Sequence, residues 1–270
     1  MHDGGLRDQV ALITGAGSGL GAAFARRLAA DGAHIVVNDL SPEAAEKTAA
    51  DVGGEAVVFD VVDSAAFDAA VDAVVARHGR LDIVVNNAGI APPPDEARQE
   101  RMLANLALRA AGRFDRQQPV RALTSMTDED WDRMIRVHLY GAFHGTRAAL
   151  RHMEERRSGA IVNIASVLGL KPTGGAAHYS VAKAAIIALT QAVAEEVAPL
   201  GVRVNAVCPG YTDTPLLSPL TEEMRSMVKM RIGMGRMAAP EEIAEVVRFL
   251  VGPESSYCTG EIVSVSGGYG

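Results

Sequence analysis

The sequence predicts an α/β protein built on one doubly wound, parallel, seven-stranded sheet. Three observations support this prediction: short runs rich in β-branched residues, segments of helical period between them, and no Ser/Gly-rich linker that would separate a second domain. Near-continuous apolar strands indicate a parallel sheet covered on both faces, so residues 1–270 are expected to form a single domain. The strands are expected at residues 10–14, 34–39, 55–60, 81–86, 161–166, 202–207 and 261–265.

Length and composition restrict the class of protein. The 270 residues are 48% hydrophobic and 22% charged, with a formal net charge of −7, which is typical of a soluble globular chain and unlike a nucleic-acid-binding protein. The absence of a long apolar stretch and of a signal-peptide pattern predicts a cytoplasmic protein with no membrane partner. Cys208 and Cys258 form no CxxC and no histidines cluster at metal spacing, so neither a disulfide framework nor a metal site is expected.

A glycine-rich turn follows the first strand. Residues 14–21 read TGAGSGLG and lead into a helical pattern over residues 22–30. Glycines let the backbone approach a pyrophosphate, whose charge is stabilised by the helix N terminus. The strict GxGxxG pattern is absent because position 20 is Leu, so a simple tight loop is the alternative to a dinucleotide site. The candidate cofactor-binding residues of this turn are Gly15, Gly17, Ser18, Gly19, Leu20 and Gly21.

The second and third strands end in acidic residues suited to adenosine. Asp39 lies about twenty residues beyond the glycine turn, where a carboxylate can accept both ribose hydroxyls and repel a 2′-phosphate. NAD is therefore expected as the cofactor rather than NADP. Alternatively, Asp39 would cap the helix that begins at Pro42, although Ser41 is better placed to do so. Asp60, followed by Val61, would either meet the adenine amino group or be only a turn residue.

The fourth strand ends in Asn86-Asn87-Ala88-Gly89. Small and amide side chains suit a backbone that crosses beneath a cofactor. The same four residues could also form an ordinary turn.

Tyr179 and Lys183 are the strongest catalytic candidates. They lie at the first and last positions of YSVAK and therefore share one helix face. A lysine one turn from a phenol stabilises the phenolate and lowers the tyrosine pKa towards neutrality, so that the phenol can exchange a proton with an alcohol or carbonyl oxygen. Ser166 ends the fifth strand and can hydrogen-bond the same oxygen. A Tyr-xxx-Lys pair alone is more often a solvated helix face, but its order with the glycine turn, Asp39 and Ser166 favours catalysis.

This order of motifs resembles the classical short-chain dehydrogenase/reductase family, which has a Rossmann fold. The resemblance extends from Val10 to Gly268 and rests on TGAGSGLG, NNAG, the strand-end serine, YSVAK and the CPG that begins at Cys208. It implies hydride transfer between a nicotinamide and a carbinol or carbonyl carbon. Tyr179 would be the general acid/base, Lys183 its electrostatic tuner and a ribose ligand, and Ser166 would orient the substrate oxygen. The resemblance also implies cofactor contacts from Leu20, Asp39, Leu40, Asp60, Val61, Asn87, Ala88, Gly89, Pro209, Gly210, Thr212 and Thr214.

Position 138 departs from the family pattern. The family usually completes a tetrad with an Asn in V-N-x-x-G, whereas this chain reads VHLYG over residues 137–141. An apolar stripe on the same helix directs the imidazole of His138 inward, as expected of a core histidine with a satisfied ring nitrogen. The alternative makes His138 a catalytic member, whose distorted helix holds the water that connects Lys183 to solvent.

An insertion and a methionine-rich segment concern the substrate. The insertion, at about residues 92–122, has apolar positions of helical period over residues 95–114, flanked by arginines. It is expected to form an extra amphipathic helix near the active-site mouth, serving either substrate selection or a solvent-facing or subunit contact. Five methionines after Thr214 would line an apolar lid, or simply pack against the helix at 240–251. They are Met224, Met227, Met230, Met234 and Met237.

The sequence thus predicts an NAD-dependent oxidoreductase acting on a hydrophobic secondary alcohol or ketone. The alternative substrate class is a 3-hydroxyacyl or 3-oxoacyl thioester, because VHLxGxF is similar to the 3-hydroxyacyl-CoA dehydrogenase units of peroxisomal multifunctional enzymes. A non-enzymatic alternative is an NAD(H)-binding sensor. The family resemblance also implies a homotetramer, assembled through helices at 127–157 and 179–199 and the C-terminal strand.

Overall fold

Seven parallel strands form one sheet in the computed structural model, which describes residues 5–92, 95–218 and 220–269. The strand order is β3-β2-β1-β4-β5-β6-β7, and every neighbouring pair is parallel. This confirms the predicted doubly wound α/β fold. The strands are β1 (Val10–Ile13), β2 (His34–Asp39), β3 (Glu55–Val58), β4 (Ile83–Asn86), β5 (Gly159–Ile164), β6 (Val202–Pro209) and β7 (Ile262–Val265).

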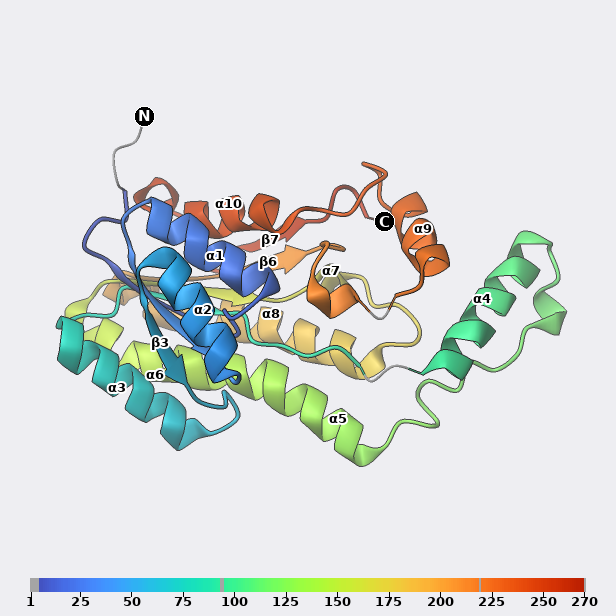
Figure 1. Ribbon diagram of the computed structural model, residues 1–270, viewed down its shortest axis with the longest axis horizontal. Coiled ribbons are helices and arrows are strands. Elements are labelled where there is room, and N and C mark those ends of the chain that lie inside the picture. The colour runs from blue at the N-terminus through green and yellow to red at the C-terminus, as the bar shows by residue number, and fades with distance from the viewer. Residues whose placement is uncertain (1–4, 93–94, 219, 270) are drawn as a thin grey trace.

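Helices cover both faces of the sheet (Figure 1). One face is covered by α1 (Gly19–Ala30), α2 (Pro42–Val52) and α10 (Pro240–Val251), and the other by α3 (Ser64–His78), α6 (Gly141–Arg156) and α8 (Ala177–Val197). Alternate residues of a strand point to opposite faces. Accordingly, Ile13 of β1 belongs to the core cluster of Phe24 from α1, whereas Leu12 belongs to that of Phe67 from α3. Within the described part of the chain, no helix is both long and apolar enough to cross a bilayer.

The chain changes direction across the sheet between β1 and β4. β1 pairs with β2 on one side and with β4 on the other, so the crossovers run outward from this point in both directions. In open parallel sheets, the loops at the carboxyl ends of such strands separate and leave a crevice for a ligand. The topology therefore places a binding site after β1 and β4.

The helix predicted over residues 127–157 is divided by a π-helical turn. It consists of α5 (Asp128–Ile135), the turn η2 (Arg136–Tyr140) and then α6. A π turn changes the direction of the side chains that it carries and often marks a functional site. His138 lies in this turn.

The insertion forms a helix beyond the body of the sheet, next to α5 and α9 in the view of Figure 1. It consists of α4 (Glu96–Ala110) and a short 3-10 helix, η1 (Phe114–Arg116). Residues 93 and 94 of the predicted segment lie outside the described residues. The expected apolar face is not buried, because Leu106 and Phe114 are exposed. The segment is held instead by Asn105, whose amide donates to the Gln118 carbonyl (2.6 Å) and accepts from its N–H (2.7 Å).

Asp82 fixes the opposite, amino-terminal edge of the sheet. Its Oδ2 accepts a hydrogen bond from the Val10 N–H (2.9 Å) and binds Arg80 Nε (2.7 Å), while Oδ1 binds Arg156 Nη2 (2.8 Å). Burial raises the pKa of the Asp82 carboxyl, but these hydrogen bonds outweigh burial and hold the pKa below its ordinary value. The carboxylate thereby joins β1, β4 and α6.

Asp82→Ala should lower the free energy of unfolding by roughly 3 kcal/mol, because it leaves a buried N–H and two guanidinium groups without their acceptor. Urea denaturation at pH 7 measures the loss. Since the folded pKa is depressed, the stabilisation is present above the unfolded pKa of about 3.9 and is lost as pH falls through the folded value. The difference between wild type and variant should therefore shrink in acid.

The matched control for this variant is Asp72→Ala. Asp72 also binds an arginine and a histidine, Arg151 and His152, but at an exposed position. Exposed pairs contribute less than about 1 kcal/mol. Equal losses in the two variants would contradict the assigned role of Asp82.

Candidate active site

A cavity of about 1250 Å³ opens at the carboxyl ends of the strands. Its wall combines the loops after β1 to β6 with η2, α8 and the start of α4. Gly17 and Gly21 are the only residues of the sequence-predicted site that do not line it. Those that do are Gly15, Ser18, Gly19, Leu20, Asp39, Leu40, Asp60, Val61, Asn87, Ala88, Gly89, His138, Ser166, Tyr179, Lys183, Pro209, Gly210, Thr212 and Thr214.

The glycine turn has a backbone that other residues would not adopt readily. Gly15 and Gly19 have φ values of +61° and +54°, and a Cβ on Gly21 would lie 2.3 Å from the Gly15 carbonyl oxygen. Gly17 donates its N–H to Asp39 Oδ2 at 2.9 Å. Gly17 and Gly21 therefore shape the turn from behind the cavity, which explains why they do not line it.

Asn87 and Thr14 hold the glycine turn against the chain that follows β4. Asn87 Nδ2 donates to the carbonyl oxygens of Thr14 (2.9 Å) and Gly15 (3.0 Å). Thr14 Oγ1 in turn accepts from the N–H groups of Asn87 (3.0 Å) and Ala88 (3.1 Å). The sequence predicted Asn87 as a cofactor contact, but it predicted neither this role in holding the turn nor that of Thr14. The available signal was a hydroxyl residue at the junction of strand and glycine turn.

Asp39 and Asp60 lie at the end of the cavity formed by the loops after β2 and β3. Asp39 Oδ1 accepts from the Ser41 N–H (3.0 Å), and Ser41 itself caps α2 through the Ala44 N–H (3.3 Å), as expected. Asp60 Oδ1 accepts from the Val62 N–H at 3.0 Å in a local turn. Both carboxylates remain on the cavity wall and offer acceptor oxygens there.

The cavity fits a dinucleotide together with a small substrate. Positive-φ glycines bring the backbone and the N terminus of α1 to its wall, where a pyrophosphate would be stabilised. Carboxylates lie at one end and polar residues of the β6 loop at the other. Its volume exceeds the range of about 300–1,000 Å³ that is typical for a single small ligand.

Ser166, Tyr179 and Lys183 meet on this wall. Ser166 begins the short helix α7 (Val167–Leu170), and its Oγ accepts from the Leu168 N–H at 3.1 Å. Lys183 is 4% exposed, and its Nζ donates to the Ile164 carbonyl at 2.7 Å while lying 5.7 Å from the centre of the Tyr179 ring. The three predicted catalytic side chains are thus brought together from β5, α7 and α8.

Burial is the main influence on the pKa values of Tyr179 and Lys183. Burial raises the pKa of Tyr179, an effect that hydrogen bonding to Ser166 partly offsets. Burial also lowers the pKa of Lys183 to about 7. In the chain without cofactor, Lys183 Nζ donates to the Ile164 carbonyl, and burial is the main influence on the pKa of Tyr179; the tuning role of Lys183 stays a prediction.

His138 is a buried histidine that also contacts Tyr179. Its ring is 2% exposed, and Nε2 lies 3.1 Å from the Ile90 nitrogen and 3.0 Å from the Ile90 oxygen, so that the tautomer decides which bond forms. The ring packs edge-on against Tyr179 with centres 5.2 Å apart. Burial, and then the charge of Lys183, lower the pKa of His138 well below its ordinary value, so the ring is neutral. The expected satisfied ring nitrogen is Nε2.

Part of the cavity wall is apolar, but methionines contribute little to it. Only Met224 of the five candidate lid methionines lines the cavity, so the expected methionine-rich lid is wrong. Met230, at the end of α9 (Glu222–Met230), and Met234, in the turn that follows this helix, are both exposed, and Met237 packs in a core cluster. The apolar wall comes instead from a segment whose sequence, PLLSPL, could have indicated it. Its lining residues are Pro215, Leu216, Leu217 and Leu220.

The insertion contributes three residues to the cavity wall. Arg98, Gln99 and Met102 of α4 line the cavity, and Met102 Sδ would lie 3.4 Å from a Cβ on Gly175 in the opposite loop. The expected position of the insertion at the active-site mouth is confirmed. The residues themselves were missed because the helical pattern was assigned from its apolar positions, whereas polar Arg98 and Gln99 face the cavity.

Comparisons with known proteins agree with this architecture. The family model for short chain dehydrogenase matches residues 9–225. The 3-oxoacyl-[acyl-carrier-protein] reductase FabG of Thermotoga maritima is 36% identical, with 97% of this chain and 98% of the relative covered. Cis-4-hydroxycyclohexanecarboxylate dehydrogenase of Sinomonas cyclohexanicum is 39% identical, with 97% and 96% covered.

A solved structure shows the same fold. The crystal structure described as ribose-5-phosphate isomerase from Brucella melitensis 16M is 35% identical, covers 99% of this chain and 94% of its own, and has a TM-score of 0.84. The family match, the two oxidoreductase relatives and the grouping of Ser166, Tyr179 and Lys183 lead to one conclusion. The chain belongs to the short-chain dehydrogenase family and is an oxidoreductase that acts on CH–OH or C=O groups with a nicotinamide cofactor.

Proposed function

We propose that this chain is an NAD-dependent dehydrogenase or reductase of a hydrophobic secondary alcohol or ketone. The observation that carries this proposal is the apolar wall of Leu216, Leu217 and Leu220 in the same cavity as Tyr179. A polyhydroxylated substrate would leave its hydroxyl groups unpaired against this wall, at a cost in binding free energy. An apolar ring or chain would bury surface there instead.

Proton transfer is assigned to Tyr179. In oxidation, the phenolate oxygen takes the proton of the substrate hydroxyl while Ser166 Oγ hydrogen-bonds the same oxygen; in reduction, the neutral phenol returns the proton. Lys183 supplies a positive charge near the phenol and would contact the ribose of a bound nicotinamide. When bound, the nicotinamide supplies the hydride acceptor or donor. His138 is assigned as a positioning residue, because its neutral ring holds the edge of the Tyr179 ring.

Successive parts of the cavity wall are assigned to successive parts of the dinucleotide. The glycine turn would bind the pyrophosphate, with Ser18 and Leu20 beside it, and Asp39 and Asp60 would bind the adenosine. Asn87, after β4, would join the adenosine and ribose contacts. The loops after β4 and β6 would bind the nicotinamide half, through Ala88, Gly89, Pro209, Gly210, Thr212 and Thr214. NAD is preferred because Asp39 would repel a 2′-phosphate.

A second candidate function is reduction of a 3-oxoacyl thioester or oxidation of a 3-hydroxyacyl thioester. The names of two relatives describe substrates attached to a carrier. They are the Thermotoga 3-oxoacyl-[acyl-carrier-protein] reductase and a Mycobacterium tuberculosis carboxyl-CoA reductase that is 39% identical over 265 residues. Arg98 on the cavity wall would be suitably charged for an anionic carrier.

The sensor hypothesis is disfavoured because Ser166, Tyr179 and Lys183 are all present. A homotetrameric state and a cytoplasmic location remain predictions.

A substrate panel separates these functions. We expect NADH to form from NAD with cyclic and other apolar secondary alcohols, followed by absorbance, and Tyr179→Phe to lower kcat about 10³-fold while NADH affinity stays nearly unchanged. Turnover confined to 3-hydroxyacyl thioesters would establish the second candidate instead. Bound NADH with no turnover of any member would support the sensor, and full activity of Tyr179→Phe would refute the assigned mechanism.

Asp39→Ala tests the cofactor preference. Loss of the carboxylate should raise kcat/KM for NADP relative to NAD by at least about tenfold, or about 1.4 kcal/mol. Asp60→Ala is the control, since Asp60 is also acidic and on the adenosine side but is assigned to the base; it should leave the NADP/NAD ratio unchanged. The ratio is the proper readout, because Asp39 also binds the Gly17 N–H. An unchanged NADP/NAD ratio of kcat/KM in Asp39→Ala would show that Asp39 does not bind the adenosine ribose.

The pH dependence tests the proton transfer. Burial raises the pKa of Tyr179, so the phenol is neutral near pH 7. The phenolate that oxidation needs therefore becomes more abundant as pH rises above 7. We expect kcat/KM for alcohol oxidation to increase above pH 7, by at most about tenfold per pH unit, and kcat/KM for ketone reduction not to increase. Lys183, with a pKa of about 7, loses its charge over the same range. A fall in oxidation above pH 7 would show that the charge of Lys183 controls the rate instead.

A further inference from the structure

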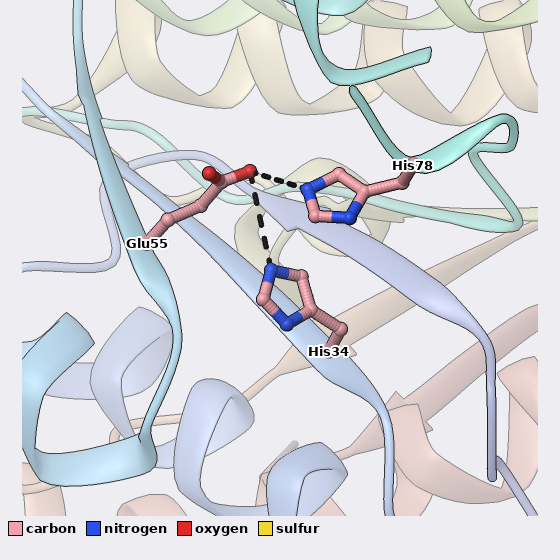
Figure 2. Close-up of side chains that lie close together, drawn as sticks. All are labelled: His34, Glu55 and His78. Carbon is pink, nitrogen blue, oxygen red and sulfur yellow. Dashed lines mark hydrogen bonds and ion pairs between the residues drawn. The ribbon is translucent and has the colours of Figure 1, made fainter. Parts of the chain in front are cut away.

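Three potential metal ligands converge at the amino ends of the strands, on the edge of the sheet opposite the active-site cavity. His34 begins β2, Glu55 begins β3 and His78 ends α3. Val36 pairs with Glu55, and His34 lies two residues before Val36, so both side chains leave the same face of the sheet. Figure 2 shows the Glu55 carboxylate directed at both imidazole rings.

The distances suit a single ion. Glu55 Oε1 lies 2.9 Å from His78 Nε2 and 4.0 Å from His34 Nε2, and the three ligand atoms all lie within 4.8 Å of one another. Ligand atoms around a tetrahedral Zn²⁺, with bonds of about 2.0–2.1 Å, are roughly 3.3 Å apart. Small side-chain rotations would therefore bring all three atoms into bonding distance of one ion.

His34 has an unexplained nitrogen in this cluster. Its Nε2 is buried and has no hydrogen-bond partner among the described residues, although it faces Glu55. The hydrogen bond between His78 Nε2 and Glu55 Oε1 satisfies these two atoms, but it leaves His34 Nε2 without a partner among the described residues. Burial of an unpaired nitrogen is unfavourable, and coordination to an ion would satisfy it.

We propose that His34, Glu55 and His78 bind one divalent transition-metal ion of the Zn²⁺ type. Two imidazoles and a carboxylate are a donor set that Zn²⁺ accepts, with water as a fourth ligand. Side-chain exposures of 38% for His34, 18% for Glu55 and 21% for His78 allow an ion to enter from solvent. Arg77 binds the other carboxylate oxygen of Glu55, so Oε1 is left to the two imidazoles, and coordination of the ion would replace its hydrogen bond to His78.

The place of the cluster indicates a stabilising role. β3 is an edge strand, joined to the sheet only through β2. An ion held by His34, Glu55 and His78 would join β3, β2 and α3 at one point. The cluster shares no residue with the cavity wall, so its loss should not change the chemistry.

Zn²⁺ titration of chelator-treated protein tests the proposal, with binding followed by calorimetry. Wild type should bind one equivalent, and the Tm should rise by roughly 5–10 °C at a metal concentration about 100 times Kd. His34→Gln removes one ligand but retains the bond between His78 and Glu55. It should weaken Zn²⁺ binding more than about tenfold, since even a group outside the ligand shell commonly changes affinity by about that factor.

His152→Gln is the matched control. His152 also pairs with a carboxylate, Asp72, at 2.8 Å, but within the described residues no second histidine joins that pair to form a cluster. This variant should bind Zn²⁺ like wild type. Equal weakening in His152→Gln and His34→Gln, or wild-type affinity in His34→Gln, would overturn the proposal.

A measurement on the unaltered protein keeps the proposal testable if His34→Gln does not fold. Co²⁺ bound to two imidazoles and a carboxylate in a tetrahedral site gives strong visible absorption, and Zn²⁺ should displace it. One equivalent of such Co²⁺, removed by one equivalent of Zn²⁺, would support the site. Absence of this absorption, together with no saturable Zn²⁺ binding, would overturn it.

Discussion

The close approach of the glycine turn to the chain after β4 is the constraint on which the active site depends. A Cβ on Gly15 would lie 2.8 Å from the Ala88 Cα, so the two backbones can be this near only because residue 15 is glycine. Asn87 and Thr14 then join them through four hydrogen bonds that alternate between side chain and backbone. This contact fixes the N terminus of α1 beside the loop after β4. The two halves of a dinucleotide site thereby acquire one geometry.

The same loop extends this constraint to Tyr179, the proposed proton-transfer residue. Gly89 approaches the ring of His138 so closely that a Cβ would lie 2.5 Å from Cε1, and the backbone of Ile90 hydrogen-bonds to Nε2 of the same ring. His138 in turn packs against the edge of Tyr179. The π-helical turn supplies the backbone that directs this imidazole into the site. Displacement of the β4 loop would therefore move the phenol as well as the cofactor cradle.

The sequence was most informative where function depends on local patterns. The seven strands, the glycine turn and the spacing of Tyr179 and Lys183 are each visible over a few residues, and the resemblance to the family ordered them. The role of Asn87 in holding the glycine turn was not predictable, because its partner Thr14 lies 73 positions away. The pKa of Lys183 also escaped prediction, since it depends on burial and on the Ile164 carbonyl. His34, Glu55 and His78 come from three separate elements, so no spacing rule connects them.

The two edges of the sheet make opposite demands on stability. At the carboxyl edge, Lys183 and the neutral His138 are buried. Removing these polar side chains from water lowers the free energy of unfolding. At the amino edge, carboxylates are surrounded by cations: Asp82 binds two arginines, and Asp31 is bound by Arg27 and Arg248. These groups stabilise the folded state without contacting the cavity. Because a single domain unfolds cooperatively, stabilisation at the amino edge offsets the destabilisation at the cavity without altering the groups that line it.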